Sequence, residues 1–155
     1  MYKEELMLKL LLLFALFFSG YTLSGNISKI SDGDTLSLNA KGEQYKIRLL
    51  GIDAPELKQS FGKQSRNHLL KLCPIKSRAK VFFKKRDKYG RILGKLECKN
   101  AKEVNKQMVL EGFAWAYREY SKEFVKQEQR AKQLKKGLWS EENPIYPQDF
   151  RKQFR

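Results

Sequence analysis

The residues best suited to chemistry gather in the run IRLLGIDAPE, residues 47–56, which carries one arginine, one aspartate and one glutamate. An acidic turn, DGDT at 32–35, lies upstream, and an arginine turn, DKYGR at 87–91, lies downstream. Carboxylates can hold a hard metal ion, and an arginine can donate two hydrogen bonds to one phosphate group. These residue types, repeated at predicted strand ends, indicate cleavage of a phosphodiester.

Five side chains would share that work. Asp34 and Asp53 could supply hard oxygens to Ca²⁺ or Mg²⁺, and Glu56 could orient or deprotonate a water. Arg48 and Arg91 could each bind phosphate oxygens in a forked geometry that lysine lacks. Each motif is weak alone, because Asp-Gly turns are common hairpin signals that need no metal. Their combination in one small basic domain predicts a site.

Residues 1–24 have the layout of a secretory signal. A short polar start with two lysines precedes an unbroken apolar run at 10–18, and small residues follow at 22–24. Even when extended to 10–23, the run is shorter than the roughly 20 residues that span a bilayer. We therefore expect a secreted or periplasmic protein. The alternative is an uncleaved anchor that keeps the chain membrane-associated at the cell envelope through residues 10–23.

The net charge of +15 lies outside that segment. Residues 1–24 hold two lysines and two glutamates, which sum to zero, so residues 25–155 carry the whole excess. A charge this large attracts polyanions. Nucleic acid is favoured over two alternatives, a basic surface kept for solubility and one that binds an anionic membrane.

The two cysteines, Cys73 and Cys98, form an even pair. In an exported protein such a pair favours a disulfide over two free thiols. The predicted hairpin of residues 78–86 and 91–98 would bring the two cysteines close together. Their spacing is not that of a metal-binding Cys-x-x-Cys motif.

Alternating apolar and polar residues predict the strands. Tyr45, Ile47 and Leu49 alternate with Lys46 and Arg48, so Arg48 should point away from the face of Ile47 and Leu49. The predicted strands begin at 26–30, 35–39 and 45–49 and continue with the hairpin 78–86 and 91–98.

Helical spacing predicts helices at about 65–72, 103–111 and 122–136. Gly112 and Gly137 are their expected stops. The third helix should bury Phe124, Ala131, Leu134 and Leu138. The predicted fold is mainly β with helices (α+β), a five-stranded OB-fold barrel with three α-helices.

The ordered motifs make the chain resemble the staphylococcal nuclease (thermonuclease-like) family over residues 26–142. This resemblance implies an OB-fold domain at 25–142. A basic tail follows at 143–155, and its last residues, 150–155, are basic with interleaved aromatics and either help to hold a polyanion or are frayed. The motifs are DGDT at 32–35, RLLGIDAPE at 48–56, DKYGR at 87–91, VN at 104–105, GFA at 112–114 and GLW at 137–139.

The resemblance also implies calcium-dependent hydrolysis of DNA and RNA that leaves 3′-phosphate ends. Asp34 and Asp53 match the calcium carboxylates, and Ala54 matches a position that supplies its backbone carbonyl. The best-studied member has threonine at that position, and alanine keeps the carbonyl. Arg48 and Arg91 match the two catalytic arginines.

The remaining matched residues contact water or substrate. Glu56 matches the glutamate that orients or deprotonates the attacking water, and Lys88 and Tyr89 match residues that contact a terminal phosphate. Tyr117 and Tyr120 lie near the tyrosines that line the nucleotide pocket, although their spacing differs. The loop after Glu56 is also shorter than in the best-studied member.

Two other functions compete with the nuclease. A non-catalytic OB-fold module at the cell envelope would grip nucleic acid without cutting it, but such modules lose an arginine or the glutamate. A basic protein anchored through residues 10–23 would bind anionic surfaces, but it leaves Arg48 and Glu56 unexplained. Neither the motifs nor the composition implies a protein partner.

Overall fold

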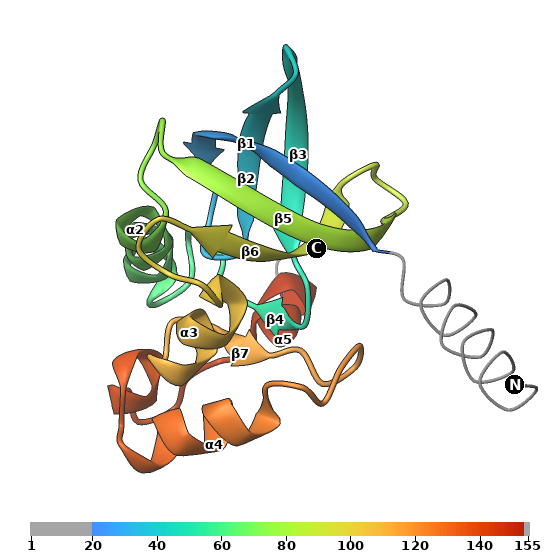
Figure 1. Cartoon of the computed structure of the whole chain (residues 1–155). Coiled ribbons are helices and arrows are strands. Elements are labelled where there is room, and N and C mark those ends of the chain that lie inside the picture. Colours follow the sequence, from blue (N-terminus) through green and yellow to red (C-terminus); the bar gives the residue numbers. More distant parts are fainter. Residues whose placement is uncertain (1–19, 154–155) are drawn as a thin grey trace, which may run out of the picture.

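Five strands close into a barrel, with the order β1-β2-β3-β6-β5. The computed structural model, shown in Figure 1, describes residues 20–153. Neighbouring strands are antiparallel except β3 and β6, which pair in parallel. The predicted five-stranded barrel with helices is therefore confirmed. Its strands are β1 (Tyr21–Ile30), β2 (Thr35–Ala40), β3 (Glu43–Leu49), β5 (Arg78–Arg86) and β6 (Ile92–Cys98).

Strand alternation fills the barrel and turns Arg48 outward. Ile47 and Leu49 on β3 are almost fully buried, as is Ile92 on β6, which pairs with Ile47. Arg48 lies between the two buried β3 residues on the opposite face, as its position in the alternation predicts. The side chain that the sequence singled out therefore leaves the core and remains available for a site.

The first strand starts earlier than expected. Tyr21 pairs with Phe83 on β5, and Ser24 pairs with Lys80, so residues 21–24 lie in β1. Residues 1–19, with the apolar run at 10–18, lie outside the described residues. Within residues 20–153, no helix has the length and apolar character needed to cross a membrane.

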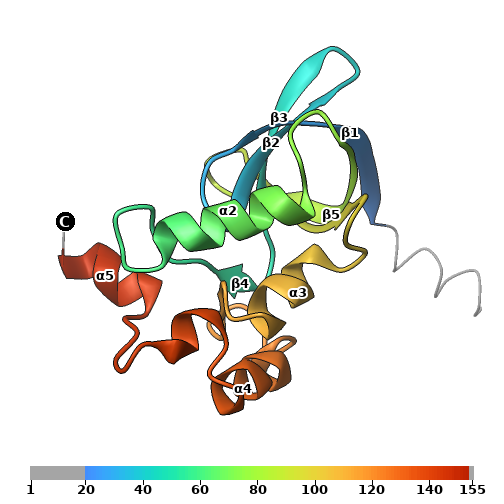
Figure 2. The same cartoon turned by 90° about the vertical axis from the view of Figure 1, so that its left-hand side faces the viewer.

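The helices pack outside the barrel. Figure 1 and Figure 2 show α2 along one side of the barrel, with α3 and α4 below the barrel. The three predicted helices are present with shifted ends, and α5 was not predicted. The helices within residues 20–153 are α2 (Gly62–Leu72), α3 (Val104–Leu110), α4 (Val125–Gln133), the 3₁₀ helix η1 (Gly137–Ser140) and α5 (Pro147–Gln153), with a small sheet of β4 (Ile52–Asp53) and β7 (Trp115–Ala116).

Gly112 ends α3 as the sequence predicts. Its φ of 77° is left-handed, its N–H bonds to the carbonyl of Val109, and the N–H of Phe113 bonds to the carbonyl of Met108. This pair of bonds is the Schellman motif. A side chain at Gly112 would bring a Cβ within 2.1 Å of the Lys136 carbonyl oxygen, so the turn also needs glycine for space.

The predicted end of the third helix is wrong. Lys135 adopts a left-handed φ of 49°, and the N–H of Lys136 bonds to the carbonyl of Ala131, so α4 closes at Gln133. Leu134 then follows the helix instead of facing its inner side, and it is 46% exposed. A lysine at the left-handed position gave no sequence signal for this stop, because glycine normally takes it.

A disulfide joins Cys73, just after α2, to Cys98 at the end of β6, with 5.4 Å between the Cα atoms. The bridge closes a loop of chain with a sequence separation of 25. Such a bridge restricts the unfolded chain, which raises the free energy of unfolding. It thereby fixes α2 against the barrel.

Candidate active site

Arg48 is the centre of a cluster at the end of β3. Its Nη2 donates to Oδ1 of Asp53 at 3.0 Å, and its Nε lies 3.2 Å from Oδ1 of Asp34. Nη1 donates to the backbone carbonyls of Leu49 and Ile52 at 2.7 and 2.8 Å. The guanidinium therefore joins two carboxylates from different loops and fixes the path of the chain between β3 and β4.

The turn between β1 and β2 delivers Asp34. The N–H of Asp34 bonds to Oδ1 of Asp32 at 3.0 Å, an aspartate-stabilised turn. A Cβ at Gly33 would lie 1.9 Å from the hydroxyl of Ser65 and 2.7 Å from the Cβ of Ala54. Glycine is thus required for the turn to pack against α2 and the chain after β4. That packing sets the position of the Asp34 carboxylate.

Asp53 comes from β4 and is 1% exposed. The next residue, Ala54, donates its N–H to Oδ2 of Asp34 at 2.7 Å. The two predicted calcium carboxylates are therefore connected twice, through Arg48 and through the backbone at Ala54. The structure brings Asp34, Asp53 and Ala54 together, as the sequence-based hypothesis requires.

A second layer of structure supports β4. Asp53 pairs with Trp115 on β7, and Ala116 on β7 donates its N–H to the buried carboxylate of Glu128 on α4 at 3.1 Å. The same carboxylate pairs with Arg118 and Lys132. Helix α4 thus holds β7 in place, and β7 holds the strand that carries Asp53.

Glu56 lies in the turn after β4, and its side chain is 37% exposed. Its N–H bonds to the side-chain oxygen of Gln59 at 3.1 Å, and its carbonyl accepts the N–H of Gln59 at 2.8 Å. The Arg151 guanidinium, from α5, bonds to both Glu56 and Asp53. Glu56 therefore belongs to the same cluster as Asp53 and is open to solvent on one side.

The sequence did not single out Arg151 as a site residue. Residues 150–155, which include Arg151, were expected either to hold a polyanion or to be frayed. A sequence signal for α5 was nevertheless present, because Pro147 suits the first position of a helix and Asp149 follows in its first turn. A helix at 147–153 would present polar side chains, although nothing in the sequence indicates which residues these side chains would contact.

Burial and mutual repulsion characterise the carboxylates. Burial, with the negative charge of Asp34, raises the pKa of Asp32 to about 7. Burial also raises the pKa of Asp53, although Arg151 and Arg48 oppose that shift. The carboxylates of Asp53 and Glu56 raise the pKa of Arg151 even though its burial acts the other way. The site thus concentrates negative charge in a protein that is positive overall.

The donor set fits a calcium ion. Asp34 and Asp53 offer hard carboxylate oxygens on adjacent chain segments, which Ca²⁺ prefers, and Ala54 adds a backbone carbonyl. Residues 20–153 contain no group of three or more His, Cys, Asp or Glu side chains placed to hold a metal. The two carboxylates would therefore need water or substrate oxygens to complete a calcium shell. An open shell of this kind is typical of a catalytic ion.

Arg91 immediately precedes β6, the strand that pairs with the Arg48 strand β3. It precedes Ile92, which pairs with Ile47, while Leu93 pairs with Arg48. Because side chains alternate along a strand, this register puts Arg91 on the face of Leu93 and Arg48. The Arg91 Nε donates to Oδ2 of Asp87 at 2.7 Å, which orients the guanidinium.

The predicted substrate residues form two pairs. Tyr89, in the turn before Arg91, is 71% exposed, and Lys88 lies 5.1 Å from the centre of its ring. The rings of Tyr117 and Tyr120 lie 4.7 Å apart, and Tyr120 is 68% exposed. Burial and the nearby charge of Asp53 raise the pKa of Tyr117. Its N–H bonds to the carbonyl of Gly51, just before the strand β4 that carries Asp53.

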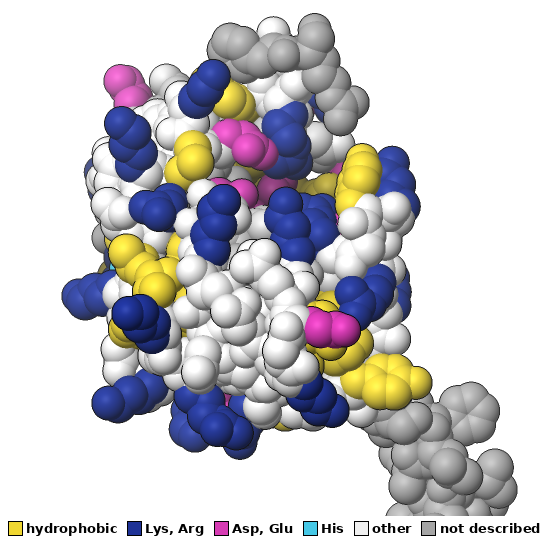
Figure 3. All heavy atoms as spheres, turned by 90° about the horizontal axis from the view of Figure 1, so that it is seen from above, with side chains coloured by type: hydrophobic (Ala, Val, Ile, Leu, Met, Phe, Trp, Pro, Cys, Tyr) yellow, Lys and Arg dark blue, Asp and Glu magenta, His cyan; other side chains and the backbone are white. Residues whose placement is uncertain are grey.

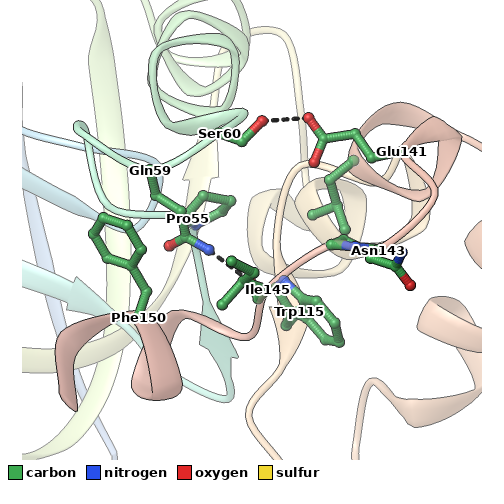
Figure 4. Close-up of a pocket in the computed structure, with 10 residues that line it drawn as sticks. Pro55, Gln59, Ser60, Trp115, Glu141, Asn143, Ile145 and Phe150 are labelled. Carbon is green, nitrogen blue, oxygen red and sulfur yellow. Dashed lines mark hydrogen bonds between the residues drawn. The ribbon is translucent and has the colours of Figure 1, made fainter. Parts of the chain in front are cut away.

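The C-terminal segment packs beside the site. Figure 4 shows a small cavity lined by Pro55, Trp115 and Phe150, among others, where the turn after β4 meets the segment that leads into α5. Gln59 donates to the carbonyl of Ile145 at 2.6 Å across this junction. Residues 141–150 are therefore attached to the same turn that carries Glu56.

Basic side chains dominate the exposed surface. Figure 3 shows lysine and arginine side chains spread across one face, with a few acidic side chains set among them. The excess follows from 32 Lys and Arg against 17 Asp and Glu. A polyanion that approaches this face meets mainly basic side chains.

The fold and the site together define a class, the OB-type barrel with a carboxylate and arginine cluster at one end. The family model for staphylococcal nuclease homologues matches residues 46–141. An uncharacterized endonuclease of Escherichia coli is 37% identical over 127 residues, covering 81% of this chain and 82% of that protein. The chain belongs to the staphylococcal nuclease family.

Two further relatives support this family assignment. An uncharacterized endonuclease of Haemophilus influenzae is 38% identical over 130 residues, which cover 82% of this chain and 72% of that protein. A staphylococcal-like nuclease of Arabidopsis thaliana is 41% identical over 115 residues, 73% of this chain but only 35% of that protein. The class of activity is that of a nuclease, a hydrolase of phosphodiester bonds.

Proposed function

We propose that the protein is an exported, calcium-dependent nuclease that hydrolyses DNA and RNA with little sequence specificity and leaves 3′-phosphate ends. One observation carries the proposal. Arg48 is bonded to both Asp34 and Asp53, and Glu56 shares a guanidinium partner with Asp53. A phosphate-binding group, two hard-oxygen ligands and a base thus meet at one end of the barrel.

The charges of this cluster suit the reaction. A bound calcium ion would supply positive charge that offsets the charge developing on the phosphate. Arg48 and Arg91 donate to the non-bridging phosphate oxygens, whose negative charge grows toward the transition state. Asp87 holds Arg91 in the orientation needed for a forked contact.

Glu56 acts on the nucleophile. Its carboxylate accepts a proton from a water whose oxygen bonds to phosphorus. The bond from phosphorus to the 5′ oxygen breaks, and that oxygen takes up a proton to become a hydroxyl. The phosphate stays on the 3′ side, so the products are a 3′-phosphate and a 5′-hydroxyl.

Low specificity follows from the contacts available. Arginine contacts to phosphate fix a strand without reading its sequence. Tyr117 and Tyr120 present aromatic faces beside the carboxylates, and any base can stack on such faces. The positive surface draws DNA and RNA alike.

Export is supported by two features. Residues 1–24 have the composition of a secretory signal. The Cys73–Cys98 disulfide suits an oxidising compartment such as the periplasm or the exterior. We assign the activity to the barrel, whose first strand begins at Tyr21, together with its helices through α5. The mass of the protein recovered after export would show whether cleavage removes Tyr21–Ser24 from β1.

A nuclease assay on the purified protein tests this function. Plasmid DNA and RNA should both be degraded with Ca²⁺, and a chelator should stop the reaction. Arg91→Ala should lose activity in the calcium arm, while Arg86→Ala, an exposed arginine at the same hairpin, should retain it. Salt-sensitive binding without product in every arm would instead identify a non-catalytic module. Full activity in excess EGTA would overturn the calcium requirement.

A further inference from the structure

Arg151 covers the solvent side of Asp53. Its Nη2 donates to Oδ2 of Asp53 at 2.9 Å, and its Nη1 donates to Oδ1 of Asp53 at 3.2 Å and to Glu56 at 2.8 Å. Asp53 is 1% exposed, whereas the Arg151 side chain is 34% exposed. Since Arg48 also donates to Oδ1, both oxygens of this carboxylate are bonded to arginine.

Helix α5 is attached in a way that delivers Arg151 to this position. The ring of Tyr146, just before α5, packs edge-on against Trp115 with 5.2 Å between centroids. Trp115 pairs with Asp53 between β7 and β4. Gln59 donates to the carbonyl of Ile145, and Figure 4 shows Phe150 beside Pro55 and Gln59. These contacts anchor the segment without using Arg151.

The Arg151 guanidinium and a calcium ion would compete for the same carboxylate oxygens of Asp53. Both are cations, and both use the syn and anti lone pairs of a carboxylate. The forked contact with Asp53 leaves its oxygens little room for a further cation at ordinary ligand distance. Glu56 is likewise engaged by Arg151, so the carboxylate proposed to act on water is bonded at the same time.

We propose that Arg151 is a positioning residue that holds Asp53 and Glu56 until calcium replaces it on Asp53. Arg151 therefore sets the calcium affinity of the site, because the ion binds only the fraction of molecules in which the guanidinium has moved away. Its release also frees Glu56 to contact water. This inference rests on the proposed calcium-dependent function, and it assigns to the C-terminal helix a role in metal binding.

Calcium titration by calorimetry tests the proposal on the full chain, without any activity measurement. Arg151→Gln should bind Ca²⁺ about tenfold more tightly than the wild type, since the competing charge is gone. Arg151→Lys should fall between the two, because it keeps the charge but loses the fork. Lys152→Gln is the matched control: Lys152 lies on the same helix, contacts only Asp149 among the bonds described, and should leave the affinity unchanged.

The outcomes separate this inference from the proposed function. Equal or weaker calcium affinity in Arg151→Gln, with the wild type binding normally, would overturn the role of Arg151 and leave the calcium requirement intact. That result would fit a third phosphate-binding arginine instead. A failure of the wild type and of every variant to bind Ca²⁺ would overturn both. Thermal unfolding of each variant in EGTA confirms that the compared proteins are folded.

Discussion

Arg48 on β3 and Asp53 on β4 are bonded through Nη2 and Oδ1 at 3.0 Å, although the chain turns sharply between them. The same guanidinium donates to two backbone carbonyls of that turn. Arg48 is thus held in one orientation before any substrate arrives, with its 12% exposed side chain at the site surface. Preorganised donors of this kind lower the barrier most, because little reorganisation is left for the reaction.

Arg48→Lys should therefore lower kcat/KM by about 100-fold or more. Lysine keeps the charge, but one ammonium cannot replace the bonds to Asp34, Asp53 and the two carbonyls. Steady-state cleavage of a fluorogenic oligonucleotide in Ca²⁺ would measure the loss. Arg86→Lys, at an exposed arginine that bonds to the carbonyl of Gly90, is the control and should keep nearly full activity. Retention of most activity by Arg48→Lys would show that the guanidinium bonds to the two carboxylates and the two carbonyls are not needed for catalysis.

Glu56→Gln tests the proton transfer. Glutamine keeps the size of the side chain and one acceptor oxygen, but it cannot accept a proton from water. We expect kcat to fall by about 100-fold to 10,000-fold, the usual contribution of a general base, while KM changes little. Single-turnover measurements at saturating Ca²⁺ would separate the chemical step from product release.

Glu123→Gln serves as the control for Glu56, because Glu123 forms an exposed pair with Lys95 away from the carboxylate cluster. Its rate should match that of the wild type. If Glu56→Gln retained a rate close to the wild-type value, water activation would have to come from another group. The assignment of Glu56 would then be wrong even with the rest of the site intact.

The sequence predicted those parts of the fold that follow from local pattern. Alternation placed Arg48 outside the barrel, and the left-handed Gly112 ended α3 as expected. The parallel pairing of β3 with β6, which puts Arg91 on the face of Arg48, depends on contacts between distant segments and leaves no periodic signal. The short strands β4 and β7 have two residues each, too few for any alternation to be visible.

Arg151 shows why part of the site could not be predicted. Its partner Asp53 lies 98 residues away in the chain. Helix α5 is seven residues long, and its only buried residue is Pro147, so it lacks the apolar stripe that marks a longer helix. The family motifs end before this segment begins. The packing of Tyr146 against Trp115 and the bond from Gln59 to Ile145 bring the arginine to the carboxylates.

Asn105 is a structural residue among the matched motifs, and its replacement should destabilise the fold. Its side chain is 2% exposed, accepts the N–H of Leu96, and donates to the carbonyls of Leu50 and Gly94. Asn105→Ala removes the side-chain partner of the Leu96 N–H and of the Leu50 carbonyl, while the Gly94 carbonyl keeps the N–H of Leu50, so we expect the free energy of unfolding to fall by about 2–4 kcal/mol. Urea denaturation followed by tryptophan fluorescence would measure the change.

Asn100→Ala is the matched control for Asn105. Asn100 is exposed and makes a single 3.2 Å bond to the carbonyl of Lys71, so its loss should cost less than about 0.5 kcal/mol. A comparable small effect for Asn105→Ala would show that water replaces the lost bonds. The turn after Arg48 would then be held by the backbone bond from Leu50 to Gly94 and by the bonds from Arg48 to the Leu49 and Ile52 carbonyls.

Asp32 makes the stability of the calcium-free protein depend on pH. Burial and the charge of Asp34 raise its pKa from 3.8 to about 7 in the folded state. Between these two values the folded protein binds more protons than the unfolded chain, so this group lowers the free energy of unfolding as the pH rises. Asp32→Asn should remove this pH-dependent loss of stability, because asparagine does not titrate. The turn should remain, since the amide oxygen can still accept the N–H of Asp34.

The free energy of unfolding of Asp32→Asn should therefore equal that of the wild type near pH 4 and exceed it by about 2 kcal/mol at pH 8. This value is reduced to allow for the partial solvent access of Asp32. Urea denaturation in EGTA at pH 4.5, 6 and 8 would measure the difference, with Asp149→Asn, an exposed carboxylate on α5, as the control. A difference that is constant with pH, or a less stable variant at pH 8, would contradict the raised pKa. Added Ca²⁺ should narrow the difference at pH 8, because a cation on Asp34 favours the ionised form of its neighbour.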